Sequence, residues 1–298
     1  MNTVQTLSVP TMLGTYPKTQ PLKDGTLTSP LVRLDFADVD TAQKAFKAVV
    51  REEKYDVAEL AIITFLQAFD AGTPYVLLPF VMNGNFHHRS IVCRDDATFT
   101  ASELAGRKVA MRAYTQTTPT WVRGFLCDDY GVNLAGVHWL SQQGAHVANY
   151  EEPEWVSRIE STLSLEDMLR AGEVDAIIAG SGLSGEPGIR PLIPSPADAA
   201  AAWHARTGAV PINHMVTVKR SLAQAHPEAV REVYRLLCEA RSLAQQGKPQ
   251  GAIDLQPVGF DKVAPGIELA IRYAFEQRLI SRRYTLEELY GPVLDILG

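Results

Sequence analysis

The residues best suited to bind a small anion lie between positions 108 and 130. This stretch reads as a short strand, a hydroxyl-rich loop at 112–118 and a helix that begins with Pro119, for which Thr118 is the expected N-cap. Backbone N–H groups at a helix N-terminus favour a carboxylate. Arg112 would grip it, because the planar guanidinium fork matches a carboxylate. The loop residues that could contact the ligand are Tyr114, Thr115, Gln116, Thr117 and Thr118.

The helix that follows this loop has an apolar face and ends at Gly131. Trp121 lies at a spacing that is more typical of a core residue than of a ligand contact. Arg123 lies one turn into the helix, close to the expected anion site. It could instead pair with Asp128 or Asp129.

Glu59 is a candidate general base. It follows the apolar strand expected at 55–58, where a carboxylate would emerge at the carboxyl end of the strand. The alternative is a solvated glutamate at a helix N-terminus, a position that also favours Glu. The sequence alone leaves both readings open.

Three histidines lie in polar stretches between apolar runs. His87 and His88 are adjacent in the stretch 83–90, and either could donate a proton because imidazole titrates near neutral pH. Their alternative role is a hinge that bonds the backbone. His214 ends a similar stretch at 206–214, where it could act as an acid, orient a neighbour or be an ordinary core histidine.

Further ligand contacts are expected beside these groups. Arg89 is a second candidate for holding a carboxylate, and Ser90 follows it. Ser181 follows the strand expected at 174–179, where small residues would let the backbone approach a ligand. The alternative for Ser181 is an ordinary turn in a glycine-rich run.

Strands and helices alternate along the chain, which predicts parallel α/β sheets. The stretches 83–90 and 206–214 read as crossings between two α/β lobes. Residues 1–90 and 215–298 would form lobe 1, and residues 91–214 would form lobe 2. Ligands of such folds bind at the carboxyl ends of strands, so we expect a ligand cleft between the lobes.

The C-terminal third predicts three amphipathic helices, at 228–246, 266–278 and 285–297. The last has Thr285 as N-cap and Glu288 three residues later, which is a capping box. These helices could support a homo-oligomer.

Composition excludes several classes of protein. The 298 residues carry a net charge of −6, so no basic field exists to hold nucleic acid. The apolar runs are too short to span a bilayer, and the N-terminal residues do not read as a secretory signal, so we expect a cytoplasmic protein. Three widely spaced cysteines match neither a disulfide framework nor a metal motif. No nucleotide-binding loop or nucleophilic serine motif is present.

Several stretches resemble the 4,5-dihydroxyphthalate decarboxylase family, within the type II periplasmic-binding-protein-like fold. They are YDVAELAIITFL (Tyr55–Leu66), FHHRSIVC (Phe86–Cys93), LAGRKVAMRAYTQTTPTWVRGFLCDDYGV (Leu104–Val132), TGAVPINHMVTVKR (Thr207–Arg220) and EQRLISRRYTLEELY (Glu276–Tyr290). The third stretch is the most specific. The family usually has Phe-Arg-His-Ser where this chain has Phe-His-His-Arg-Ser, so the resemblance does not decide which histidine takes the family position.

The resemblance implies a cofactor-independent decarboxylase that converts a dihydroxylated aromatic dicarboxylate, of the 4,5-dihydroxyphthalate type, to a protocatechuate-like product in aromatic catabolism. Glu59 would be the base near the hydroxyls, His88 or His214 the acid, and Arg112 the clamp on the remaining carboxylate. His87 would contact the substrate. A divalent metal on Glu59, His88 and His214 is conceivable as ligand chemistry but ranks below a metal-free site. The alternative function is a solute-binding protein that delivers an aromatic carboxylate to an ABC-type transporter.

Overall fold

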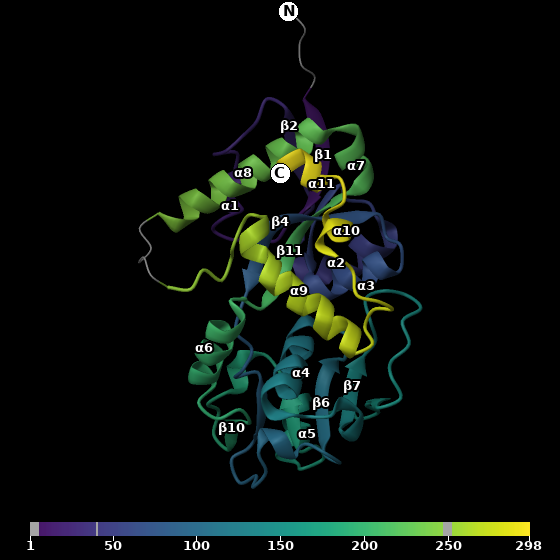
Figure 1. Cartoon of the computed structure of the whole chain (residues 1–298), viewed down its shortest axis with the longest axis vertical. Coiled ribbons are helices and arrows are strands. Elements are labelled where there is room, and N and C mark those ends of the chain that lie inside the picture. Colours follow the sequence, from purple (N-terminus) through teal and green to yellow (C-terminus); the bar gives the residue numbers. More distant parts are fainter. Residues whose placement is uncertain (1–5, 40, 247–251) are drawn as a thin grey trace, which may run out of the picture. The chain divides into compact units, whose positions relative to one another are not determined.

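The computed structural model describes residues 6–39, 41–246 and 252–298, and this part of the chain forms two compact units (Figure 1). Unit 1 comprises the chain up to Gly84 together with Ile212–Glu268 and Tyr284–Gly298. Unit 2 comprises Asn85–Pro211 and Leu269–Arg283. Each unit has its own sheet, as expected for two α/β lobes.

The unit boundaries differ from the predicted division at residues 90 and 214. Strand pairing explains the difference, because Gly84 pairs with Ile212 inside the sheet of unit 1. Residues 269–283 belong with unit 2 rather than with the rest of the C-terminal part, because Arg272 and Gln277 bond to a helix of unit 2.

The sheet of unit 1 has five strands in the order β2-β1-β3-β11-β4. The first three are parallel to one another, as predicted, whereas β11 runs antiparallel to both β3 and β4. β11 is the strand on which the chain returns to this sheet. The strands are β1 (Leu7–Met12), β2 (Val32–Phe36), β3 (Val57–Ala61), β4 (Tyr75–Gly84) and β11 (Ile212–Lys219).

Helices cover this sheet with their apolar faces. Helix α2 buries Phe46 and Val49 and packs against β3 and α3. Helices α10 and α11 pack against β4, and α11 also packs against α8 (Figure 1). The helices of unit 1 are α1 (Gln20–Lys23), α2 (Ala42–Glu52), α3 (Ile62–Asp70), α7 (Arg220–Ala225), α8 (Pro227–Gln245), α10 (Leu286–Tyr290) and α11 (Val293–Leu297), and α9 (Phe260–Glu276) contributes residues to both units.

Two predicted helices need correction. The helix expected at 285–297 is two helices, because Gly291 takes φ 50° and ψ −126° and ends α10. The capping box of Thr285 and Glu288 is confirmed at its start. The helix expected at 266–278 begins earlier, at Phe260, because Pro265 is accommodated inside α9.

The sheet of unit 2 has six strands in the order β10-β5-β9-β6-β7-β8, with the run from β9 to β8 parallel and β5 antiparallel to its neighbours. Helix α5 packs on β5, β6 and β9 around an apolar core. The strands are β5 (Ile91–Arg94), β6 (Lys108–Ala113), β7 (His138–Gln143), β8 (Val156–Arg158), β9 (Ala176–Ile178) and β10 (Ile189–Pro191). The helices are α4 (Thr117–Tyr130), α5 (Leu165–Arg170) and α6 (Pro196–Thr207), with short 3-10 turns at Ala101–Glu103, Leu134–Gly136 and Ser181–Leu183.

Over the described residues, no helix has the length and apolarity that a membrane crossing requires.

Candidate functional site

Glu59 lies inside β3 and is fully buried, with 0% of its surface exposed. The sequence placed it just after the strand, but β3 continues through Ala61 before α3 begins. The reading of Glu59 as a solvated helix N-terminus is therefore wrong. A buried carboxylate must have hydrogen-bond donors around it, because burial otherwise disfavours its charge.

Three donors surround the Glu59 carboxylate. The backbone N–H of Gly14 donates to Oε2 at 2.9 Å, and the hydroxyl of Tyr16 donates to Oε1 at 2.8 Å. Nδ1 of His214 lies 2.6 Å from the same Oε1. Burial alone would raise the pKa of Glu59. The hydrogen bond from His214, the attraction of that histidine when it is protonated, and the hydrogen bonds from Gly14 and Tyr16 together hold the pKa below its usual value. Burial, followed by the charge of Glu59, raises the pKa of Tyr16. Glu59 is therefore ionised and Tyr16 neutral at pH 7.

The loop after β1 is shaped to make these contacts. Thr19 closes it, because its hydroxyl donates to the Gly14 carbonyl at 2.7 Å and accepts from the Tyr16 N–H at 2.9 Å. A Cβ on Gly14 would lie 2.6 Å from the Tyr16 ring, so only glycine fits there without displacing the tyrosine. The sequence analysis missed this loop. The signal available was that the carboxyl ends of the parallel strands β1 and β3 meet at one edge of the sheet.

His214 is held on β11 opposite the end of β3. It pairs in register with Ala61 across the antiparallel ladder, and its ring is nearly perpendicular to that of Phe46, with centroids 5.2 Å apart. The residue is 6% exposed. Because an ionised carboxylate can only accept, the contact with Glu59 requires a proton on Nδ1. Nε2 is then the nitrogen that can exchange a proton with a ligand.

His88 lies in unit 2 within a cluster of aromatic rings. It stacks on Phe125 with centroids 4.0 Å apart and planes at 9°, and Phe86 and Trp203 lie farther off. The residue is 1% exposed, and neither ring nitrogen has a hydrogen-bond partner among the residues that the structure describes. Burial, followed by the charges of His87 and Arg206, lowers the pKa of His88 to about 4. His88 is therefore uncharged at neutral pH.

The neighbours of His88 divide between the core and the surface. His87 is buried, and its carbonyl accepts from the N–H of Ser90 at 2.9 Å in a tight turn. Ser90 is buried as well, whereas Arg89 is exposed. Ser181 belongs to a 3-10 turn, but its side chain lies outside the described residues.

The start of α4 differs from the prediction by two residues. The N-cap is Gln116, not Thr118, and Thr117 is the first helical residue. With the Gln116 amide oxygen turned towards Arg112, that oxygen accepts from Nε at 3.0 Å and Nη2 at 2.7 Å of this exposed guanidinium. Thr115 and Thr117 are buried, and the Thr117 hydroxyl has no hydrogen-bond partner within the described ranges, while Thr118 is half-buried.

Arg123 and Tyr114 form part of the interior of unit 2. Arg123 is fully buried and donates to the Gln277 side chain at 2.7 Å and to the Tyr114 carbonyl at 2.6 Å. Its guanidinium lies 3.8 Å above the Tyr114 ring, so the protein itself occupies that face of the ring. Trp121 is buried, in agreement with its predicted core position.

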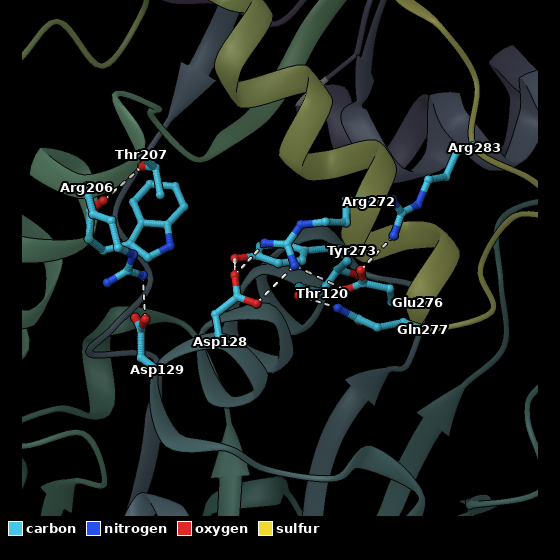
Figure 2. A network of polar contacts seen from close by, with 11 residues as sticks. Thr120, Asp128, Asp129, Arg206, Thr207, Arg272, Tyr273, Glu276, Gln277 and Arg283 are labelled. Carbon is cyan, nitrogen blue, oxygen red and sulfur yellow. Dashed lines mark hydrogen bonds and ion pairs between the residues drawn. The ribbon is translucent and has the colours of Figure 1, made fainter.

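The prediction that Arg123 pairs with Asp128 or Asp129 is wrong. Figure 2 shows Asp128 bound instead by Arg272 and by the Tyr273 hydroxyl, which donates at 2.6 Å. Asp129 pairs with Arg206. The first of these contacts joins α9 to α4 and explains why residues 269–283 belong to unit 2.

Curated relatives identify the family. A 4,5-dihydroxyphthalate decarboxylase from Pseudomonas putida is 30% identical over 217 residues, which cover 66% of this chain and 81% of the relative. The chain belongs to the 4,5-dihydroxyphthalate decarboxylase family. A decarboxylase of the same name from Comamonas testosteroni is 29% identical over 234 residues, covering 72% of this chain and 69% of that relative. No family model matches the chain.

Solved structures place this family member in the type II periplasmic-binding-protein-like fold. The periplasmic aliphatic sulphonate binding protein SsuA from Escherichia coli superposes with a TM-score of 0.60 at 15% identity, covering 95% of this chain and 91% of SsuA. A mutant of the desulfurization enzyme DszB in complex with biphenyl-2-sulfinic acid gives 0.56 at 14% identity, covering 97% and 99%. At these identities the likeness concerns the fold alone.

Within the described ranges, this decarboxylase-family chain has no group of three His, Cys, Asp or Glu side chains arranged to hold a metal ion. Of the three residues considered for a metal, Glu59 and His214 belong to unit 1 and His88 to unit 2. Of the three predicted catalytic residues, the structure brings Glu59 and His214 into contact, joined by the unpredicted Tyr16. An ionised carboxylate that fixes an imidazole tautomer is suited to proton transfer.

Proposed function

We propose that this protein removes one carboxylate as CO₂ from a dihydroxylated aromatic dicarboxylate of the 4,5-dihydroxyphthalate type. The observation that carries the proposal is the buried Glu59–His214 pair, found in a chain of the 4,5-dihydroxyphthalate decarboxylase family. The pair supplies a proton-transfer group, which this reaction needs and which ligand binding alone does not.

Decarboxylation of an aromatic ring requires particular groups in the site. When the carboxylate leaves as CO₂, the electron pair of the broken C–C bond stays on the ring carbon, and a proton must then add to that carbon. In 4,5-dihydroxyphthalate each carboxylate lies para to a hydroxyl. Removing the proton of that hydroxyl makes the ring carbon more basic, so a base at the hydroxyl and an acid at the carbon both assist.

His214 is better suited than Glu59 to the role of general base. A carboxylate whose pKa is held below its usual value is a weak base towards a phenol. Glu59 instead fixes the proton on Nδ1 of His214 and leaves Nε2 to take the hydroxyl proton. We therefore assign the base to His214 and the orienting role to Glu59.

His88 is the proposed contact at the carbon that gains the proton, with His87 and Ser90 beside it. Because His88 is uncharged at neutral pH, that proton comes from solvent, and His214 returns the hydroxyl proton to the product. Within the described residues neither nitrogen of this buried imidazole has a hydrogen-bond partner, which is unfavourable, and a bound ligand would relieve that cost. Arg112, with Gln116 and the threonines at the start of α4, is the proposed holder of the remaining carboxylate. The proposed chemistry uses no metal, so a chelator should leave turnover unchanged.

The test is to incubate the purified protein with 4,5-dihydroxyphthalate and to measure CO₂ and the aromatic product by chromatography. Phthalate, which has no hydroxyl to deprotonate, should bind without turning over. His214→Gln should lose activity, whereas His138→Gln, at an exposed position of β7, should keep it. Binding of 4,5-dihydroxyphthalate without CO₂ release would favour the solute-binding alternative. If the protein neither bound nor turned over 4,5-dihydroxyphthalate, both functions would be rejected.

A further inference from the structure

The proposed chemistry gives no role to Tyr16, the third side chain of the Glu59 cluster. Its hydroxyl donates to Oε1 of Glu59 at 2.8 Å, and Nδ1 of His214 lies 2.6 Å from that same oxygen. The other oxygen, Oε2, accepts from the backbone N–H of Gly14. Two side-chain donors therefore share one carboxylate oxygen. Each of them weakens the attraction of that oxygen for the other, because a donor partly neutralises the charge of its acceptor.

The Tyr16 hydroxyl acts towards Glu59 as a permanent donor. Burial, followed by the charge and the hydrogen bond of Glu59, raises the pKa of Tyr16 above the ordinary value of a phenol. The phenol therefore keeps its proton at neutral pH and well above it. Against the effect of burial, Tyr16 contributes with His214 and Gly14 to the lowered pKa of Glu59. Its hydroxyl thus makes the carboxylate less attractive to protons, including the proton on Nδ1 of His214.

Lys23, at the end of α1, holds the loop that carries this tyrosine. Its ammonium group donates to the Leu13 carbonyl at 2.8 Å and to the Thr15 hydroxyl at 2.9 Å. Burial lowers the pKa of Lys23, while the charges of Glu59 and Asp38 oppose that effect. The lysine therefore adds a positive charge beside the cluster and fixes the loop at the same time. With the loop fixed, the phenol is directed at the carboxylate rather than free to turn towards solvent.

We propose that Tyr16 is a positioning residue for His214: by sharing Oε1, its hydroxyl limits the strength of the Glu59–His214 bond and so sets the pH above which Nε2 can accept a proton. The role rests on the proposed function, in which His214 is the base. Without the hydroxyl, Oε1 has His214 as its remaining side-chain donor and stabilises the protonated imidazole more strongly. The imidazole then stays protonated to a higher pH, and less of the free base is present at neutral pH.

Tyr16→Phe removes the hydroxyl and keeps the ring, and kcat/KM for 4,5-dihydroxyphthalate is then measured against pH. The acid limb of the profile should move up by about one pH unit, so that activity below the limb falls about tenfold, the size expected for a lost hydrogen bond to a charged group. Activity at high pH, where the imidazole is unprotonated in both proteins, should not fall. The matched control is Tyr75→Phe in β4. The hydroxyl of this buried tyrosine donates to the Tyr55 carbonyl, and its removal should leave the wild-type profile unchanged.

Proton NMR tests the same contact without substrate. The Nδ1–H signal of His214, assigned by its absence in His214→Gln, should move downfield in Tyr16→Phe because the bond to Oε1 tightens, and it should stay in place in Tyr75→Phe. An active, native-like Tyr16→Phe with an unmoved acid limb would overturn the proposal. If the wild type releases no CO₂, the decarboxylase function is rejected and the NMR signal decides alone. A downfield shift would then uphold the action of Tyr16 on His214, and an unmoved signal would overturn it.

A second variant keeps the test decisive if Tyr16→Phe fails to fold. A Cβ on Gly14 would lie 2.6 Å from both the ring and the hydroxyl oxygen of Tyr16, so Gly14→Ala must push the end of the tyrosine away from Glu59. This variant keeps the phenol, yet it should move the acid limb and the His214 signal in the same directions as Tyr16→Phe. Gly14→Ala with a native circular dichroism spectrum and the wild-type limb and signal would overturn the proposal.

Discussion

Replacing Glu59 by Gln should invert the tautomer of His214. The amide has the shape of the carboxylate, but it offers one acceptor and one donor group where the carboxylate offers two acceptors. Gly14 decides how the amide turns, because its backbone N–H always donates and needs the amide oxygen at the Oε2 position. The NH₂ group then faces His214 and Tyr16.

The preference for this orientation can be estimated. Turning the amide the other way leaves the buried Gly14 N–H facing a donor, which costs about 1–3 kcal/mol, or a factor of about 5 to 150 in population. The tyrosine hydroxyl can rotate to accept. His214 can accept only on an unprotonated Nδ1, so its proton moves to Nε2. The nitrogen proposed as the base is then blocked, and kcat should fall by about 10⁴, as when an amide replaces the orienting carboxylate of a catalytic histidine.

Two measurements check this prediction. Nitrogen-15 NMR of labelled imidazoles distinguishes a protonated Nδ1 from a protonated Nε2, and it does so without any substrate. Turnover of 4,5-dihydroxyphthalate gives the change in kcat. Glu52→Gln, at an exposed glutamate of α2, is the matched control and should change neither quantity. If Glu59→Gln kept the proton on Nδ1, the reasoning about Gly14 would be refuted.

The same variant should change how stability depends on pH. The pKa of Glu59 is lower in the folded chain than in the unfolded one, so the carboxylate stabilises the fold above about pH 4.3, the unfolded value. This contribution is lost as the pH falls through the folded pKa. The difference in unfolding free energy between wild type and Glu59→Gln should therefore shrink below about pH 4. Hydrogen exchange in β3 and β11 is the suitable probe, because all four tryptophans lie in unit 2.

Three further predictions concern unit 2. His88→Phe keeps a buried ring but removes the group whose pKa is about 4, so turnover should fall by about 10² or more while phthalate still binds. Between about pH 6.5 and 4 the unfolded wild-type chain takes up a proton on His88 that the folded chain does not, so the variant should lose less unfolding free energy than the wild type over this range. Equal pH dependence of stability in the two proteins would contradict the assignment. Arg112→Ala should raise KM about tenfold or more with little change in kcat, and an unaltered KM would remove Arg112 from the carboxylate site. Gly124→Ala places a Cβ 2.3 Å from the Tyr273 ring and should destabilise unit 2 by about 1–3 kcal/mol, measured by tryptophan fluorescence in urea. The control Gly136→Ala, with open space around the added Cβ, should leave the stability unchanged. Equal urea midpoints of unfolding for the two variants would count against the packing argument.

Local signals in the sequence determined much of the secondary structure. Gly131 ends α4 with φ 65°, as expected of a helix C-terminus, and the capping box starts α10. These features depend on neighbours within a few residues, so a single sequence can reveal them. The family could also be recognised from the sequence, because its motifs are contiguous stretches of chain.

Only the tertiary structure decided what surrounds the proposed catalytic groups. Gly14 and Tyr16 reach Glu59 across 45 and 43 residues of chain, and His214 reaches it across 155. The pairing of β1 and β11 with β3 sets these contacts, and strand order and register do not follow from local patterns. The burial of His88 among aromatic rings likewise depends on packing between distant segments. The sequence alone thus indicated which residues could carry chemistry, and the sheet of unit 1 decided that a carboxylate, a phenol and an imidazole form one cluster.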